Sequence, residues 1–227
     1  MTRALIVNAD DFGRSRGINA GIARGHDAGV VTSASVMVCW PAAEEAAALA
    51  RVRPGLSVGL HVDLSEWEYR DGDWCASYAR VGEDAETEAE VGRQLELFRD
   101  LFEHEPTHLD SHQHVHRNEP VRSVLTAAGA VLGVPVRDVS PLVMYRGDFY
   151  GQTGRGEPVP DAIEVAALVR LIASLPEGIT ELGCHPATEA DLASTYSAER
   201  VAELEALCDP RVLAAIEAEG IELRSFA

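Results

Sequence analysis

The sequence has no long hydrophobic run and no cluster of basic residues. None of its apolar segments approaches the roughly 18 residues that a helix needs to cross a bilayer, so we expect no membrane span. Its 19 Lys and Arg residues are outnumbered by 37 Asp and Glu residues, which gives a formal net charge of -18. Because this charge repels phosphate groups, neither nucleic acid nor an anionic membrane is an expected partner.

A signal peptide and a cysteine motif are also missing. The segment from Met1 to Asp11 has no apolar run of signal-peptide length followed by small residues, so we expect a cytoplasmic protein. The four cysteines are far apart and form no C-x-x-C pair; they are Cys39, Cys75, Cys184 and Cys208. This spacing fits neither a zinc ribbon nor a disulfide framework, and we predict reduced thiols.

Length and periodicity indicate a folded α/β protein. With 227 residues, 46% of them hydrophobic, the chain can bury one large core, and we expect a single domain over residues 1–227. Short apolar runs alternate with segments of helical spacing. We predict strands at Ala4–Asn8, Val30–Val38, Leu56–Leu64, Thr107–Val115, Val134–Val139, Thr180–Cys184 and Ile221–Ser225. We predict helices at Arg16–His26, Ala42–Ala50 and Glu90–Phe102, after Pro120, Pro160 and Pro210, and after a cap at Ser197.

This alternation favours a parallel sheet that is covered on both faces or closed as a barrel, with the active site at the carboxyl ends of the strands. Two stretches, 67–84 and 145–157, are rich in Gly, aromatic and polar residues, and we expect them to be functional loops. Their aromatic residues either stack on sugar rings or hold the loops in place. These are Trp67, Trp74, Tyr78, Tyr145, Phe149 and Tyr150.

Potential metal ligands are concentrated at four predicted strand ends. They are Asp10 and Asp11, His61 and Asp63, the run from His108 to His116, and His185. Alternate residues of a strand share a face, so the histidines of the run and Asp110 would all point to one side. Such a polar face must line a cavity, hold a metal or form a dense hydrogen-bond network.

A hydrolytic metal site combines two or three imidazoles with a carboxylate and keeps a position for water. The strand ends offer this set. Asp10 and Asp11 are adjacent, so an extended backbone would point them apart, whereas a turn through Phe12 and Gly13 would let both face one pocket. One carboxylate would then bind the metal and the other would take protons.

The motifs resemble those of the YdjC-like carbohydrate deacetylases, which include the chitooligosaccharide deacetylases. The matching segments are Asn8–Gly13, Gly59–Leu64, His108–His116 and Glu181–Pro186, in the order of that family. The resemblance implies a distorted (β/α) TIM-like barrel related to the polysaccharide deacetylase barrel. It also implies one divalent metal ion and hydrolysis of an N-acetyl group from an amino sugar.

The resemblance further assigns roles to individual residues. Asp11, His61 and His112 would bind the metal, Asp10 would be the general base and His185 the general acid. Two roles are left open for a further set of residues: they either support the metal ligands or contact the substrate. They are His114, His116, Asp110 and Arg137. The ligand set suits Zn²⁺ or, with water completing an octahedron, Mg²⁺, Mn²⁺, Co²⁺ or Ni²⁺.

The expected partner is a small N-acetylated sugar or glycoconjugate, and homodimer formation is left open. Two rival functions are a metal-dependent phosphoesterase and a non-catalytic sugar- or metal-binding protein on the same fold. A single bound metal would count against the first. The presence of both Asp10 and His185 counts against the second, because a simple metal binder needs neither a base nor an acid.

Overall fold

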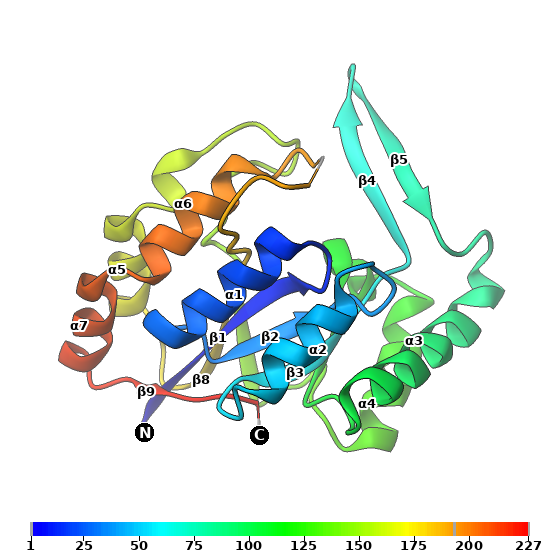
Figure 1. Ribbon diagram of the computed structural model, residues 1–227, viewed down its shortest axis with the longest axis horizontal. Coiled ribbons are helices and arrows are strands. Elements are labelled where there is room, and N and C mark those ends of the chain that lie inside the picture. Colours follow the sequence, from blue (N-terminus) through cyan, green and yellow to red (C-terminus); the bar gives the residue numbers. More distant parts are fainter. Residues whose placement is uncertain (1, 193, 227) are drawn as a thin grey trace.

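The computed structural model describes residues 2–192 and 194–226, and its centre is a curled parallel sheet (Figure 1). The strand order is β6-β3-β2-β1-β8-β7, with β9 paired to the start of β1. The strands are β1 (Arg3–Phe12), β2 (Ser33–Val36), β3 (Ser57–Val62), β6 (Leu109–Ser111), β7 (Val143–Arg146), β8 (Gly178–Cys184) and β9 (Glu222–Leu223). Their pairings are parallel, so their carboxyl ends meet at one edge. The predicted α/β fold with a parallel sheet is confirmed.

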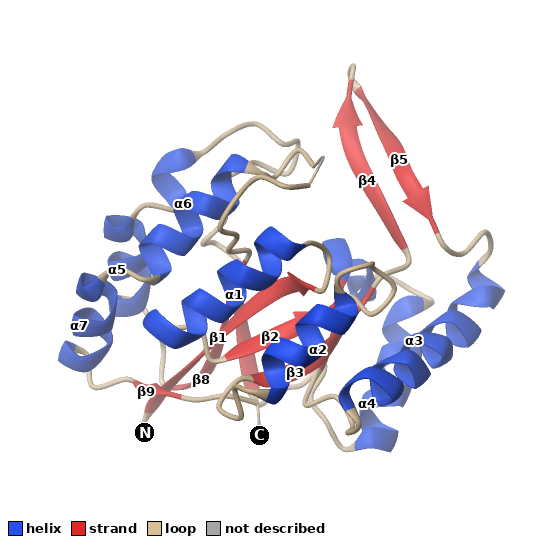
Figure 2. Ribbon diagram, in the orientation of Figure 1, coloured by secondary structure: helices blue, strands red, loops and turns tan. Residues whose placement is uncertain are grey.

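Helices surround the sheet, as Figure 2 shows. They are α1 (Arg16–Ala28), α2 (Ala43–Arg51), α3 (Thr87–Phe102), α4 (Val121–Leu132), α5 (Val165–Ala173), α6 (Ala198–Leu207) and α7 (Pro210–Ala218). Neighbouring helices pack in the order α4, α3, α2, α1, α6, α5 and α7, which follows the strand order around the half-barrel. The central strand β1 is therefore buried along nearly its whole length, as expected for a parallel sheet covered by helices. No helix within the described ranges is both long and apolar enough to cross a membrane.

Helix α1 illustrates how the sequence sets these elements. The Ser15 hydroxyl accepts a hydrogen bond from the backbone N–H of Ile18, at 3.2 Å, and caps the helix. Ile18 and Ile22 are one turn apart and fully buried in the core. At the other end of the protein, Pro210 opens α7 as predicted, with Asp209 as its cap.

Two helix predictions need correction. After Pro160 there is only a short 3₁₀ turn, Pro160–Ala162, and α5 begins later at Val165. Helix α6 does begin directly after Ser197, but the Ser197 side chain makes no capping hydrogen bond.

The predicted loop over residues 67–84 is largely an antiparallel hairpin. Strands β4 (Ser65–Arg70) and β5 (Asp73–Ala79) pair with each other and project away from the rest of the protein (Figure 1). Asp71 and Gly72 both have positive φ, 53° and 90°, as a tight hairpin turn requires. The Asp-Gly pair between two short alternating runs was the signal for this hairpin.

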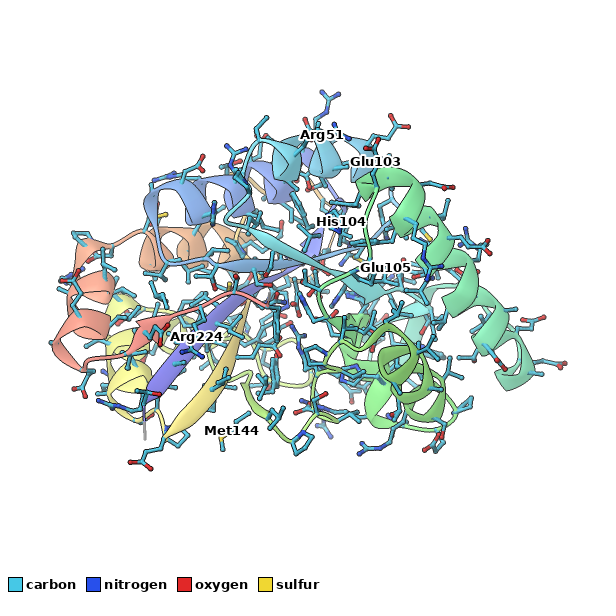
Figure 3. The ribbon with its side chains drawn as sticks, turned by 90° about the horizontal axis from the view of Figure 1, so that it is seen from below. Arg51, Glu103, His104, Glu105, Met144 and Arg224 are labelled. Carbon is cyan, nitrogen blue, oxygen red and sulfur yellow. The ribbon has the colours of Figure 1, made fainter. Side chains whose placement is uncertain are left out.

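The strand predicted at Val134–Val139 is also wrong. Only Val136 forms a bridge, to Leu109 of β6, and the chain then turns, because the N–H groups of Val139 and Ser140 both bond to the Val136 carbonyl. The strand at the opposite edge of the sheet, beside β8, is β7, which was not predicted. Its Met144 is 52% exposed on the outer edge of the sheet (Figure 3).

Candidate metal centre and catalytic site

Strand β1 delivers Asp10 and Asp11 to the carboxyl edge of the sheet. Asp11 has a left-handed backbone, with φ of 68°, and the register between β1 and β2 shifts at this point. Gly13 follows with φ of 86°, and a side chain there would also contact the backbone of α2. The turn lets both carboxylates line one cavity of about 580 Å³, so the predicted convergence of the two aspartates is confirmed.

Three buried side chains form a candidate metal centre beside this turn. Oδ1 of Asp11 lies 3.6 Å from Nε2 of His61 and 3.3 Å from Nδ1 of His112. One ligand atom from each residue lies within 4.8 Å of the other two. Oδ1 of Asp11 is buried and has no hydrogen-bond partner, although buried carboxylate oxygens normally have one. An unpartnered anionic oxygen facing two imidazoles fits a divalent cation.

His61 is held in place from behind by Asp110. Its Nδ1 lies 2.8 Å from Oδ1 of Asp110, which turns Nε2 towards Asp11, a typical arrangement for a metal-binding histidine. Burial opposes a charge on the ring, but Asp110 and Asp10 outweigh this effect and raise the pKa of His61 to about 9. A metal at Nε2 would therefore have to displace a proton.

Asp10 has a different set of partners. Both of its carboxylate oxygens accept hydrogen bonds from Arg137, each at 2.7 Å. Arg137 also contacts Asp110 and Glu181, and its side chain has no exposed surface. Burial favours the neutral acid, but the cation prevails and holds the pKa of Asp10 below its usual range. Asp10 is thus an ionised carboxylate beside the candidate metal centre.

His185 faces the cavity from the end of β8. Its Nε2 lies 3.9 Å from Oδ2 of Asp10, and its side chain keeps 20% exposure. The edges of Tyr150 and Tyr196 pack against it, with ring centres 5.4 and 5.6 Å away. This burial lowers the pKa of His185 to about 4, so the ring is neutral near pH 7.

The run from His108 to His116 does not form the predicted strand with one polar face. Strand β6 ends at Ser111, and a 3₁₀ segment, His112–Arg117, follows, in which Gln113 and His114 are left-handed, with φ of 51° and 53°. The Ser111 hydroxyl accepts from the N–H of His116 at 3.0 Å and stabilises this turn. As a result only His112 reaches the candidate metal centre.

The other histidines of this run lie elsewhere. His108 is fully buried behind the site, stacked on Phe226 with ring centres 4.1 Å apart. His114 and His116 form a second group with Asp138. Arg117 already binds the carboxylate of Asp138 at 2.8 Å, which makes this group a poorer cation site than the first.

Comparison with known proteins agrees with the motifs. The model of the family described as YdjC-like protein matches residues 4–218. The chain belongs to the YdjC-like family. A chitooligosaccharide deacetylase of Serratia marcescens is 34% identical, with 100% of this chain and 99% of the relative covered. A carbohydrate deacetylase of Geobacillus stearothermophilus is 36% identical, with 100% and 98% covered.

Solved structures show the same fold. A protein from Enterococcus faecalis superposes on this YdjC-like chain with a TM-score of 0.78, at 25% identity and with 100% and 98% of the two chains covered. A family 4 carbohydrate esterase from Streptomyces lividans gives a TM-score of 0.57 at 16% identity, with 97% and 91% covered. The predicted relation to the polysaccharide deacetylase barrel is therefore confirmed at the level of the fold.

Several site residues of this YdjC-like protein lie outside the motifs and were missed. Arg200, from α6, donates to Oδ2 of Asp11, and Arg14 lies 3.7 Å from the same oxygen. These cations keep the pKa of Asp11 well below its usual range despite its burial. Glu66, from the hairpin, lies 3.6 Å from Nε2 of His112. Glu203, from α6, accepts from the backbone N–H of His185 and from the Tyr196 hydroxyl.

The aromatic residues divide into two groups. Tyr145, Phe149 and Tyr150 line the cavity. Tyr78 instead donates to Asp63 at 2.6 Å and fixes the hairpin to the end of β3, where Asp63 also accepts from Trp40 and Arg80. The remaining pair, Trp67 and Trp74, is 45% and 50% exposed on the hairpin.

Proposed function

We propose that this YdjC-like protein is a metal-dependent carbohydrate deacetylase, which hydrolyses the N-acetyl group of an amino sugar or of an N-acetylated oligosaccharide. One observation carries the proposal: a metal-type ligand set and a separately held, ionised carboxylate with a neighbouring imidazole line the same cavity. The names of the full-length relatives point to the same reaction.

The proposed ligands are Asp11, His61 and His112. A divalent ion held there would polarise the acyl carbonyl and lower the pKa of a water molecule. Zn²⁺, Mg²⁺, Mn²⁺, Co²⁺ and Ni²⁺ are all compatible with one carboxylate and two imidazoles.

Asp10 is the proposed general base. Because Arg137 keeps it ionised, its carboxylate can accept a proton from the attacking water. Arg137 cannot take up this proton, because its guanidinium is already protonated and its buried carboxylate partners raise its pKa well above the usual value.

His185 is the proposed general acid. Since its pKa is about 4, the ring is not protonated before the reaction. Its Nε2 lies 3.9 Å from Asp10, so the proton that Asp10 takes from water can pass to this nitrogen. The imidazolium then donates the proton to the departing amine as the carbon–nitrogen bond breaks.

The rival phosphoesterase function finds less support. Two-metal hydrolases need two cation sites, but the carboxylates of both other candidate groups already pair with an arginine: Asp138 with Arg117, and Asp10 and Asp110 with Arg137. A neutral acetamide needs no additional cation, and the aromatic residues of the cavity suit the faces of sugar rings.

The test is acetate release from N-acetylglucosamine derivatives and N-acetylated disaccharides, with a chelator and with each metal added back. We expect chelator-sensitive acetate release that Asp10→Asn lowers by about 10²-fold or more while metal stays bound. Metal-loaded protein that releases no acetate from any of these sugars, but hydrolyses phosphate esters, would overturn the proposal.

A further inference from the structure

Glu66 is a buried carboxylate at the base of the hairpin that the reaction described above does not use. It is the second residue of β4 and only 7% exposed. Both of its oxygens accept from Nη2 of Arg14, at 2.7 and 2.6 Å. Its Oε1 also faces Nε2 of His112 at 3.6 Å, which is too long for a hydrogen bond.

The ring of His112 thus lies between two carboxylates. Asp11 faces Nδ1 at 3.3 Å, and Glu66 faces Nε2. Nε2 is buried and has no hydrogen-bond partner. A neutral imidazole carries one proton, and the nitrogen without it offers the lone pair that a metal needs. With a cation between Asp11 and the ring, Nδ1 would supply the lone pair, and the proton would stay on Nε2, where the carboxylate of Glu66 would stabilise it.

The hairpin is fixed to the turn that carries His112. The N–H of Trp67 donates to Oε1 of Gln113 at 2.9 Å, and Nε2 of Gln113 donates to the carbonyl of Trp67 at 2.7 Å. Trp67 follows Glu66, and Gln113 follows His112. This pair of hydrogen bonds therefore sets the position of the carboxylate relative to the ring.

We propose that Glu66 is a positioning residue for the metal centre, which holds His112 in the Nε2–H tautomer so that Nδ1 binds the cation. The inference rests on the proposed ligand set and deepens it. Asp110 acts in the same way on His61, but through the opposite nitrogen, Nδ1. The two imidazoles would thus bind one ion through different ring atoms.

The first test is the affinity for Zn²⁺, measured by competition calorimetry. Glu66→Gln is expected to weaken Zn²⁺ binding by about 10- to 100-fold, the usual effect of losing a carboxylate behind a metal-bound histidine. The matched control is Glu68→Gln, because Glu68 lies on the same strand and pairs with Arg70 instead. It is expected to change the affinity less than about 2-fold. An equal affinity of Glu66→Gln and the parent would overturn the proposal.

The second test distinguishes His112 from Arg14 as the group through which Glu66 acts. If Glu66 only neutralised Arg14, its replacement would have no further effect on Zn²⁺ affinity in an Arg14→Met background. We expect the double variant Arg14→Met, Glu66→Gln to bind Zn²⁺ at least about 10-fold more weakly than Arg14→Met alone. A difference below 2-fold would overturn the proposal.

The third test needs no variant of Glu66 and so does not depend on that variant folding. Ring ¹⁵N shifts of the Zn²⁺-loaded parent, with His112 assigned from His112→Gln, are expected to show a protonated Nε2 and a metal-bound Nδ1. Coordination through Nε2 would refute the inference. These binding measurements are independent of acetate release, so failure of the deacetylase proposal would leave them interpretable.

Discussion

Replacing Arg137 with methionine is expected to lower the free energy of unfolding by about 3–5 kcal/mol, because it leaves buried carboxylates without their cation. The guanidinium lies 2.7 Å from oxygens of Asp10 and Asp110, and its Nε lies 2.7 Å from Glu181. None of these four side chains is more than 3% exposed. Methionine keeps most of the side-chain volume, so the loss comes mainly from the charges.

The loss should also depend on pH. In the parent, Arg137 holds the pKa values of Asp10 and Asp110 below their usual range, whereas burial raises the pKa of Glu181 to about 7. Without the cation, burial and mutual repulsion raise all three pKa values relative to the parent. The folded variant then binds more protons than the folded parent, so its stability falls more steeply as the pH rises. The destabilisation relative to the parent is expected to be larger at pH 8 than at pH 6.

Urea unfolding in the presence of a chelator measures this effect without a contribution from bound metal. The matched control is Arg224→Met, since Arg224 lies on the surface (Figure 3) and pairs with Glu222 there, with 45% and 54% of the two side chains exposed. This control should change the unfolding free energy by less than about 1 kcal/mol. An Arg137→Met variant as stable as the control, with the same unfolding free energy at pH 6 and pH 8, would refute the reasoning.

Further predictions concern the metal and the proton transfers. Asp11→Ala is expected to lose bound metal, measured by elemental analysis of the purified protein, and full occupancy would remove Asp11 from the ligand set. Asp10→Asn should keep the metal while kcat for acetate release falls by about 10²-fold or more, and a normal kcat would exclude its role as base. His185→Gln should lower kcat by a similar factor with little change in metal affinity; an unchanged rate and pH profile would exclude its role as acid. A metal competes with a proton at His61, whose pKa is about 9. Calorimetry should therefore show that the apparent affinity for the metal rises about tenfold per pH unit from pH 7 to 9. An affinity that does not change with pH would contradict this prediction.

The sequence predicted which strand ends would meet. Asp11, His61 and His112 are far apart in the chain, yet each lies at the carboxyl end of a strand of one parallel sheet, and these ends share an edge. The convergence of Asp10 and Asp11 was predictable too, because two adjacent aspartates can face one pocket only if the backbone leaves the extended conformation. Their roles in binding and proton transfer stay predictions, as does the single domain over residues 1–227.

The histidine run shows where periodicity fails. Alternating residues from 108 to 116 satisfy the pattern of a strand, and the run contains no Gly or Pro to mark a turn. The turn depends instead on a left-handed backbone at Gln113 and His114 and on the Ser111 hydroxyl. Non-glycine residues adopt that conformation only when surrounding contacts hold them there, and these contacts come from the hairpin through Trp67. A contact between distant segments is not encoded in local spacing.

Arg137 was named as a candidate from the sequence, whereas Arg14 and Arg200 were missed, although the need for buried cations was predictable. Asp10, Asp11 and Asp110 are almost fully buried, and a buried carboxylate is tolerated only beside a cation or a metal. The chain contains no lysine, so arginines had to supply the charge. Arg14, Arg137 and Arg200 do so from three separate parts of the chain. A sequence that buries several acidic motif residues therefore predicts that some arginines are buried in the site, while only the fold decides which ones.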